Sequence, residues 1–188
     1  MSRPEIIPLE LPFNADLVAH LHAGQQLRLS GTLLTARDAA HKRLVEALTA
    51  GAPLPVDLRD ATIYYTGPTP APPGRAIGSA GPTTAYRMDP YVEPLLRAGV
   101  RCMIGKGARG DEVAAQLAEY AAVYCVAIGG AGALLSECIT GCRALAYADL
   151  GPEAIYELTV REFPVTVAQD MHGGNVYARA SGHAPVIT

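Results

Sequence analysis

Strand-like apolar runs alternate with short helical segments in the second half of the chain, and this alternation limits the possible folds more than any other feature. The runs "RCMIGK" (101–106) and "AAVYCVAIGG" (121–130) resemble strands, whereas "GDEVAAQLAEY" (110–120) and "AGALLSECI" (131–139) resemble helices. Strands that are separated by helices usually pair in parallel, with the helices covering the sheet. The alternation therefore predicts an α/β domain.

The first half of the chain shows a related pattern. "LRLSGTLLTA" (27–36) predicts a strand broken at Gly31, and "ARDAAHKRLVEALTAG" (36–51) predicts a helix. Thr35, followed by Asp38, resembles a capping box for this helix, and Gly51 is placed to end it.

A further strand is predicted for "ATIYYTG" (61–67), followed by a Pro- and Gly-rich loop over 68–84. A loop of this length in a compact domain is usually functional or disordered. After the loop, "DPYVEPLLRAG" (89–99) predicts a helix with Asp89 as its N-cap.

The two ends of the chain are rich in extended patterns. The segments 143–151 and 156–170 predict strands, residues 1–26 resemble a lead-in, and the tail after 170 resembles a turn with a final strand or arm. We therefore expect a single α/β domain over 1–188, with a mixed, partly parallel sheet and a second β layer.

Composition excludes several functional classes. Apolar residues make up 49% of the 188 residues and charged residues 18%, which indicates a globular chain. The net charge of −3 gives no footprint for nucleic acid. No apolar run reaches the roughly 18 residues of a membrane span, and the N-terminus lacks the apolar region of a secretory signal. We expect a cytoplasmic protein.

Four cysteines are present, at positions 102, 125, 138 and 142, and none forms a C-x-x-C pair. In a reducing compartment such residues are usually buried free thiols. We therefore predict no metal or cluster site built from these four cysteines alone.

The stretch "SAGPTTAYRMD" (79–89) places a Gly-Pro turn before two threonines and an arginine. Amide groups at a helix start attract anions, and Arg87, four residues after Thr83, is placed to bind a carboxylate. The pattern predicts an anion site with a reactive hydroxyl. An ordinary threonine N-cap beside a surface arginine is the alternative.

Two other strand-to-helix junctions carry cations. Arg37 lies in the first turn of the predicted helix 36–51, and Lys106 ends the predicted strand 101–106. Ligand-binding groups collect at strand ends in α/β sheets. Three cations around the Thr83 hydroxyl suit a small substrate with two carboxylates, for which this chain supplies part of an active site. A solvated Lys106 is the alternative.

Two nearby patterns are interpreted without a ligand. His41, Lys42 and Arg43 are taken as a solvated helix face. "AIGGAGALL" (127–135) invites a dinucleotide-binding interpretation, but Leu135 stands where that motif requires its last glycine. Tight packing between a strand and a helix explains these glycines better.

Several segments resemble class I (iron–sulfur) fumarases. They occur in the same order and at similar spacing in that family, and they include "SGTLLTARDAAHKRL", "IYYTGPTPAPPGRAIGSAGPTTAYRMDPY", "KGARG", "AIGGAGALL" and "GPEAIYELTVREFPVTVAQD". The resemblance runs from about residue 8 to residue 177. The short chain is most similar to the separate β subunit of two-subunit fumarate hydratases and L(+)-tartrate dehydratases.

The resemblance implies a swivelling β/β/α domain and a reversible addition or removal of water on a dicarboxylate. In the family a [4Fe–4S] cluster acts as Lewis acid, and the resemblance places it on a partner α subunit, not on this chain. It implies Thr83 as catalytic base and Arg37, Arg87 and Lys106 as carboxylate contacts. The implied assembly is a heterotetramer with two copies of each subunit, or a homodimer when this chain is isolated.

One residue departs from the family pattern, because Tyr86 stands where many members have glycine. A tyrosine beside Arg87 would narrow the pocket or add a hydroxyl, which favours a more hydroxylated acid such as tartrate over fumarate. The alternative is that Tyr86 points away into packing. For the whole chain, the alternative function is a stand-alone module that binds a small acid or acts as a scaffold, without catalysis.

Overall fold

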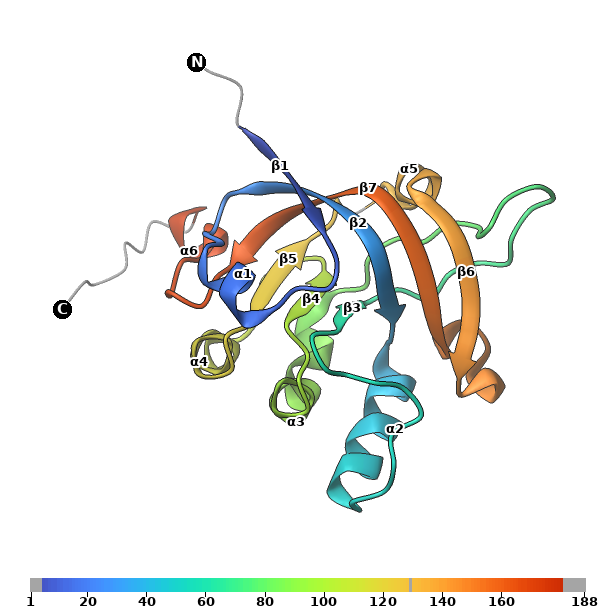
Figure 1. The fold of residues 1–188 in the computed structure, drawn as a ribbon, viewed down its shortest axis with the longest axis horizontal. Helices are drawn as coiled ribbons and strands as arrows, with labels where there is room; N and C mark the ends of the chain where they lie inside the picture. Colours follow the sequence, from blue (N-terminus) through green and yellow to red (C-terminus); the bar gives the residue numbers. More distant parts are fainter. Residues whose placement is uncertain (1–4, 129, 181–188) are drawn as a thin grey trace.

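The structure is a computed structural model that describes residues 5–128 and 130–180. In this part of the chain seven strands form one sheet, with helices packed around it (Figure 1). The strands are β1 (Ile6–Glu10), β2 (Gln26–Thr35), β3 (Thr62–Tyr64), β4 (Cys102–Gly105), β5 (Val123–Val126), β6 (Ile139–Ala146) and β7 (Ile155–Gln169). The helices are α1 (Ala15–Ala19), α2 (Asp38–Thr49), α3 (Val92–Arg97), α4 (Asp111–Glu119), α5 (Gly132–Glu137) and α6 (Val176–Ala180), with 3₁₀ helices η1 (Ala85–Tyr91) and η2 (Ala148–Glu153).

The sheet is mixed and folds back on itself. Strands β1 to β5 pair in parallel with their neighbours, whereas β7 runs antiparallel to β2, β5 and β6. Because β7 pairs with both β2 and β5, the pairings close a ring through β2, β3, β4, β5 and β7. The prediction of an α/β domain with a mixed, partly parallel sheet is confirmed.

Alternate residues of the short central strands serve two separate cores. Ile63 of β3 and Met103 of β4 pack on the side of the sheet that α2, α3 and α4 cover (Figure 1). Tyr64 and Ile104 point to the opposite side and join the core inside the ring. Both sides of these strands are buried, which explains why their sequences are continuous apolar runs.

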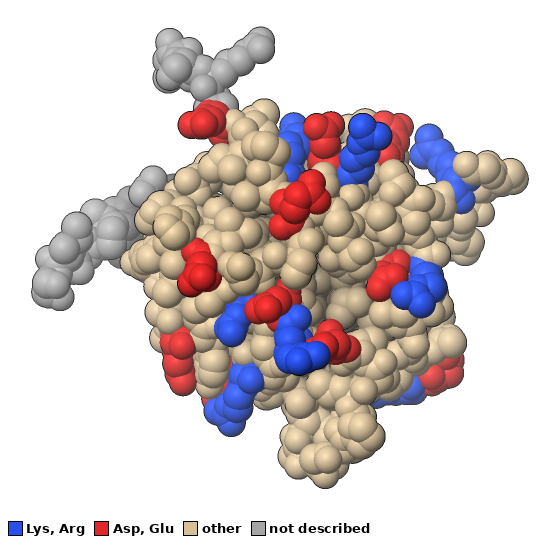
Figure 2. All heavy atoms as spheres, in the orientation of Figure 1, with Lys and Arg blue, Asp and Glu red and all other residues tan. Residues whose placement is uncertain are grey.

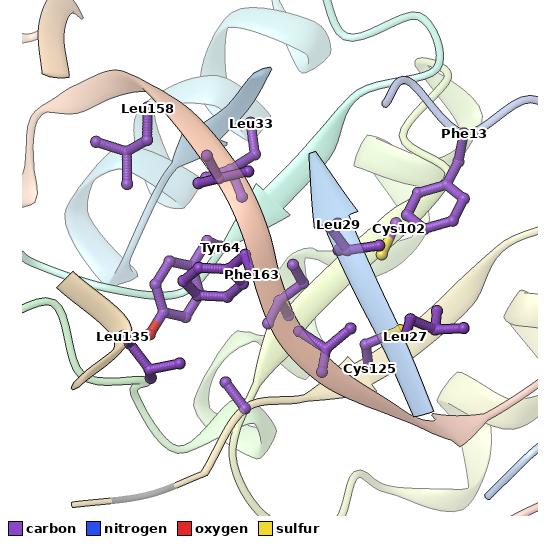
Figure 3. Packing of buried hydrophobic residues seen from close by; sticks show 14 of the residues in the cluster. Phe13, Leu27, Leu29, Leu33, Tyr64, Cys102, Cys125, Leu135, Leu158 and Phe163 are labelled. Atoms are coloured by element: carbon purple, nitrogen blue, oxygen red, sulfur yellow. The ribbon is translucent and has the colours of Figure 1, made fainter. Parts of the chain in front are cut away.

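The core inside the ring is drawn in Figure 3. The rings of Tyr64 and Phe163 meet edge to face with centroids 5.3 Å apart, and leucines of β2 pack beside them. Each fully buried side chain of this size contributes about 1.5–3 kcal/mol to the hydrophobic free energy of folding. Cys102 and Cys125 also lie here as buried free thiols, as predicted. Cys138 is only half-buried and Cys142 is exposed, so the prediction of burial was wrong for these two.

Gly31 breaks β2 as predicted, because the pairing with β7 shifts register between Leu29 and Gly31. Its φ of +122° is rare for residues with a side chain. A Cβ at this position would lie 3.0 Å from the Cβ of Leu11. The glycine therefore lets the β2 backbone pass close to the segment after β1.

The predicted capping box at the start of α2 was wrong. The hydroxyl of Thr35 donates to the carbonyl of Ala154 at 3.3 Å and accepts from the amide of Tyr156 at 3.0 Å. Thr35 therefore fixes the start of β7, and Arg37 takes the N-cap position of α2 without a capping hydrogen bond from its side chain. Asp38 is thereby left to bind elsewhere.

Other boundaries also differ from the sequence predictions. The helix predicted for 89–99 begins as η1 at Ala85 and continues as α3, so Asp89 is not its N-cap. The lead-in contains β1 and α1, and the tail contains α6 where a strand or arm was expected, with 181–188 outside the described residues. The strand predicted for 143–151 begins at Ile139 and ends at Ala146.

No helix in the described ranges combines the length and the apolar character needed to cross a lipid bilayer.

Candidate functional site

The four predicted site residues come together at one edge of the sheet, where β2, β3 and β4 end. Arg37 lies two residues beyond β2, and Lys106 directly follows β4. Thr83 reaches the end of β3, where its amide donates to the carbonyl of Tyr65 at 2.6 Å. In open α/β sheets, this carboxyl edge is where ligands bind.

Backbone hydrogen bonds fix Thr83 beside Lys106. The amide of Lys106 donates to the carbonyl of Thr83 at 3.1 Å, and the amide of Ala85 donates to the carbonyl of Lys106 at 2.9 Å. Residues 83–85 therefore act as a short parallel extension beside the end of β4, with a bridge between Thr84 and Lys106. The position of Thr83 relative to Lys106 is set by main chain.

These hydrogen bonds correct one prediction about the opening of η1. The amides of Thr83 and Ala85 are not free to bind an anion, because they donate to protein carbonyls. Thr84 takes the N-cap position of η1 but makes no capping bond with its side chain. The Thr83 hydroxyl is half-buried and has no hydrogen-bond partner among the described residues, so it is available to a ligand.

Arg87 is held by an aspartate from another helix. Its Nε and Nη2 atoms donate to the two carboxylate oxygens of Asp38 at 3.1 and 2.9 Å. This two-point contact leaves the Nη1 side of the guanidinium available, and the Arg87 side chain is 44% exposed. Arg87 is therefore oriented by the protein while part of it faces solvent.

Arg37 is held more deeply. Its Nη2 atom lies 3.5 Å from a carboxylate oxygen of Glu153, whose other oxygen accepts from the amide of Ala39 at 3.0 Å. A Cβ on Gly67 would lie 2.9 Å from the Nη1 atom of Arg37. The glycine after β3 therefore provides the space in which the guanidinium lies, next to the start of α2.

Lys106 is exposed and forms no ion pair with another described residue. By contrast, many surface charges are paired, and positive and negative side chains lie beside each other on the face drawn in Figure 2. The free ammonium of Lys106, with Arg37 and Arg87, gives the carboxyl edge three cations, and Thr83 lies at the same edge. This combination suits a small anion with more than one carboxylate.

His41 was wrongly placed on a solvated face. It is buried, its Nδ1 atom lies 2.9 Å from the carbonyl oxygen of Arg37, and burial lowers its pKa to about 4. Lys42 is exposed, as predicted, and Arg43 binds Asp149 with two hydrogen bonds. A residue pattern along one helix could not reveal that η1 covers His41.

Sequence reasoning also missed Arg109, although it lies in the quoted segment "KGARG". Arg109 is buried and binds Asp89 and Tyr65. An arginine between glycines resembles an ordinary loop residue, so the local sequence contained no indication of this role.

The described residues do not fit an iron–sulfur cluster. They include no group of three or more His, Cys, Asp or Glu side chains placed to hold a metal. Cys102 and Cys125 lie in the core inside the ring. Cys138 directly precedes β6, and Cys142 lies within β6.

Of the glycines of "AIGGAGALL", Gly132 serves packing as predicted, whereas Gly130 has no atom within 4 Å of a Cβ position and adopts a φ of +81°. Position 129 lies outside the described residues. A Cβ on Gly132 would lie 2.4 Å from the Ser79 Oγ atom and 2.9 Å from the amide nitrogen of Gly81. The start of α5 is thereby packed directly against the loop that leads to Thr83.

Comparison with known proteins finds relatives among fumarate hydratases and a tartrate dehydratase subunit, and the matches cover most of this chain. The sequence model of a family described as "Fumarase C-terminus" matches residues 4–180. Fumarate hydratase 1, mitochondrial, from Leishmania major is 39% identical over 154 residues, which cover 81% of this chain and 28% of that protein. Fumarate hydratase class I, aerobic, from Escherichia coli strain K12 is 38% identical, with the same two coverages.

A shorter relative matches over most of its own length. The putative L(+)-tartrate dehydratase subunit beta of Methanocaldococcus jannaschii is 36% identical over 166 residues, which cover 85% of each protein. This chain thus spans little more than a quarter of the fumarate hydratases named above, but most of this subunit. The extent of these matches shows that the chain belongs to the fumarase C-terminus family.

Proposed function

We propose that this chain is the β-type subunit of a hydro-lyase that adds water to, or removes it from, a small dicarboxylate. The observation that carries the proposal is the convergence of Thr83, Arg37, Arg87 and Lys106 at the carboxyl edge of β2, β3 and β4. The relatives named as fumarate hydratases and as a tartrate dehydratase subunit support the choice of reaction class.

In this proposal the cations bind the two carboxylates of the substrate. The guanidinium groups of Arg37 and Arg87 present forked donors that match a carboxylate, whereas Lys106 supplies a mobile point charge. Asp38 and Glu153 hold the arginines in place before the substrate arrives. The substrate is then fixed with its reacting carbon near the Thr83 hydroxyl.

Thr83 is proposed as the group that accepts the proton from the substrate carbon. A threonine hydroxyl has a pKa far above neutrality, so it acts as a base only where nearby positive charge stabilises the alkoxide. Arg37, Arg87 and Lys106 are the cations of this edge, so the same groups bind the substrate and favour the charged form of Thr83.

The site is proposed to be completed by another polypeptide. Lys106 and Arg87 are exposed, and one relative that this chain matches over most of its residues is named as a subunit beta. We propose that an α-type partner carries a [4Fe–4S] cluster and covers this edge in a heterotetramer.

The test is anaerobic reconstitution of this chain with its α-type partner, assayed with fumarate, malate and tartrate. Thr83→Ala should abolish turnover while sparing substrate binding. The neighbouring Thr84→Ala is a matched control, because the Thr84 side chain makes no capping bond, and it should keep most of the activity. Near-normal turnover by Thr83→Ala would remove Thr83 from the mechanism.

A wild-type complex without any hydratase or dehydratase activity would contradict the proposed reaction. A colourless chain that binds dicarboxylates and recruits no partner would instead support a stand-alone binding module.

A further inference from the structure

Arg109 carries a positive charge that is enclosed by the protein. Its side chain is 0% exposed, and its guanidinium carbon lies 5.3 Å from the ring centre of Tyr65 and 5.0 Å from that of Tyr124. Burying a charge is costly unless it is paired and hydrogen-bonded. We therefore ask which interactions of Arg109 offset the cost of burying its charge beside the site.

The polar partners of Arg109 are well defined. Its Nε and Nη2 atoms each lie 2.8 Å from Oδ1 of Asp89, and its Nη1 atom donates to the hydroxyl of Tyr65 at 3.0 Å. The second carboxylate oxygen of Asp89 accepts from the amide of Gly110 at 2.8 Å. One buried guanidinium thus joins η1, the end of β3 and the loop after β4.

Two of these segments carry a proposed site residue, and the third is hydrogen-bonded to one. Asp89 follows Arg87 by two residues within η1, and Arg109 follows Lys106 by three residues. The third link is Tyr65, whose carbonyl accepts from the amide of Thr83 at 2.6 Å while its hydroxyl accepts from Arg109.

A fourth contact closes the loop around Lys106. The hydroxyl of Tyr124, whose ring lies against the Arg109 guanidinium, donates to the carbonyl of Gly107 at 2.8 Å. The loop that begins at Lys106 is therefore held at Gly107 by Tyr124 and at Gly110 by Asp89.

We propose that Arg109 and Asp89 are positioning residues that fix the positions of Lys106, Thr83 and Arg87 relative to one another. The inference rests on the proposed function for its catalytic consequence, but its structural part stands without it. Arg109 does not touch the substrate in this scheme; it acts through Tyr65, η1 and the loop after β4. A displacement of about 1 Å in such a site costs up to about a hundredfold in rate.

Two conservative substitutions test the pair. Arg109→Lys keeps the charge but cannot bind Asp89 and Tyr65 at the same time through a planar fork. Asp89→Asn keeps the shape of the side chain but replaces one acceptor oxygen by an amide donor. The asparagine therefore cannot accept hydrogen bonds from both Arg109 and the amide of Gly110 through two separate oxygens.

Asp170→Asn is the matched control. Asp170 is a buried aspartate, whereas Asp89 is half-buried, and Asp170 accepts hydrogen bonds from the backbone amides of Ala23, His172 and Gly174. It lies beyond the end of β7, beside the beginning of β5, at the edge of the sheet opposite the site. Tyr177 of α6, the helix that follows the Asp170 turn, also contacts the backbone of Gly107, so this variant shows how far a disturbance of that turn reaches the loop after β4.

Two measurements separate the inference from the proposed function. Hydrogen exchange of the isolated chain, followed by mass spectrometry, reports on the amides of 83–87 and 106–110 without any substrate. Steady-state kinetics of the complex reconstituted with its partner reports kcat and KM. Both are measured well below the unfolding temperature of each variant.

We expect Arg109→Lys and Asp89→Asn to speed exchange selectively in these two segments and to lower kcat/KM at least about tenfold. Asp170→Asn should change exchange mainly near α1 and α6, with a smaller change at Gly107, and should lower kcat/KM less than either substitution in the pair. The inference is overturned if exchange in the two segments is unchanged, or if Asp170→Asn lowers kcat/KM as much. If the wild-type complex turns over no dicarboxylate, the proposed function fails, and exchange alone decides whether the pair orders these segments.

Discussion

Arg87 and Asp38 form a two-point ion pair that joins η1 to the first turn of α2, with donor–acceptor distances of 3.1 and 2.9 Å. Because Asp38 binds the Nε side of the guanidinium, the Nη1 side stays available for a ligand. The pair therefore orients Arg87 and does not block it. Asp38 also follows Arg37 directly in sequence, so one short segment serves both arginines.

The first prediction concerns this pair. Asp38→Ala should raise KM for the dicarboxylate by about tenfold, because Arg87 loses the partner that holds its plane, and each charge-assisted hydrogen bond contributes about 1.5–3 kcal/mol. The free energy of unfolding should fall by no more than about 1 kcal/mol, since the pair is partly exposed. Steady-state kinetics and chemical denaturation check the two values.

Asp149→Ala supplies the control for Asp38→Ala. Asp149 forms an equivalent two-point pair with Arg43, another residue of α2, at 2.8 and 2.5 Å. This pair contains none of the proposed site residues, so KM should stay near the wild-type value. An equal rise of KM in both variants would mean that Asp38 acts only through the stability of α2.

The second prediction concerns Gly67. A methyl group there would lie 2.9 Å from Nη1 of Arg37 and 3.1 Å from the carbonyl oxygen of Pro152. Gly67→Ala should therefore displace the guanidinium, lower kcat/KM at least about tenfold, and destabilise the chain by about 1–3 kcal/mol.

A double-mutant cycle with Arg37→Ala separates these two effects of Gly67→Ala. Without the guanidinium, Gly67→Ala should change the residual activity little, because nothing is left to displace, but it should still destabilise the chain through Pro152. Equal losses of activity in both backgrounds would show that the methyl group acts through the backbone and not through Arg37.

Much of this architecture was predictable from sequence because β3, β4 and β5 are short apolar runs separated by helices. The convergence of Arg37, Thr83 and Lys106 followed from one rule, that parallel strands end at a common edge. The closure of the ring was not predictable, because β2 and β7 pair across more than a hundred residues of chain. β1 was missed because prolines flank and interrupt it.

Tertiary contacts also explain the local errors. Asp89 has the sequence context of an N-cap, but its partner Arg109 lies 20 residues further along the chain. His41 sits among charged residues and looks solvated, yet it packs against the rings of Tyr65 and Tyr91. In both cases the deciding neighbour belongs to another element, so a window of local sequence cannot contain it.

The third prediction concerns Tyr86, which is 62% exposed and therefore does not point into packing. It borders a hollow of about 610 Å³ together with Asp89 and Gly110. Tyr86→Phe should change the free energy of unfolding by no more than about 0.5 kcal/mol. If the hydroxyl meets a hydroxylated substrate, its loss should lower the ratio of kcat/KM for tartrate over fumarate by about tenfold.

Tyr120→Phe is the control for Tyr86→Phe. Tyr120 lies at the far end of α4, where its hydroxyl accepts from Arg97 at 3.4 Å. Its substitution should leave the tartrate-to-fumarate ratio unchanged. An unchanged ratio in Tyr86→Phe as well would remove the hydroxyl from substrate selection.

The fourth prediction concerns the pH dependence of stability. Burial, more than any other cause, lowers the pKa of His41 from 6.5 to about 4. Below pH 6.5 the unfolded chain therefore binds a proton at His41 that the folded chain does not bind until about pH 4. The contribution of His41 to stability is fully present above pH 6.5 and is lost as the pH falls, by about 3 kcal/mol at pH 4.

Chemical denaturation of wild type, His41→Gln and His20→Gln tests this contribution. The measurements run from about one pH unit above the ordinary histidine pKa of 6.5 down to about pH 4. His20 is the matched control, because its Nδ1 atom also contacts the carbonyl oxygen four residues earlier but its side chain is exposed. His41→Gln should flatten the fall in the free energy of unfolding, whatever its stability at neutral pH, whereas His20→Gln should keep the wild-type slope. A wild-type slope in His41→Gln would mean that His41 takes up its proton equally well in the folded and the unfolded chain.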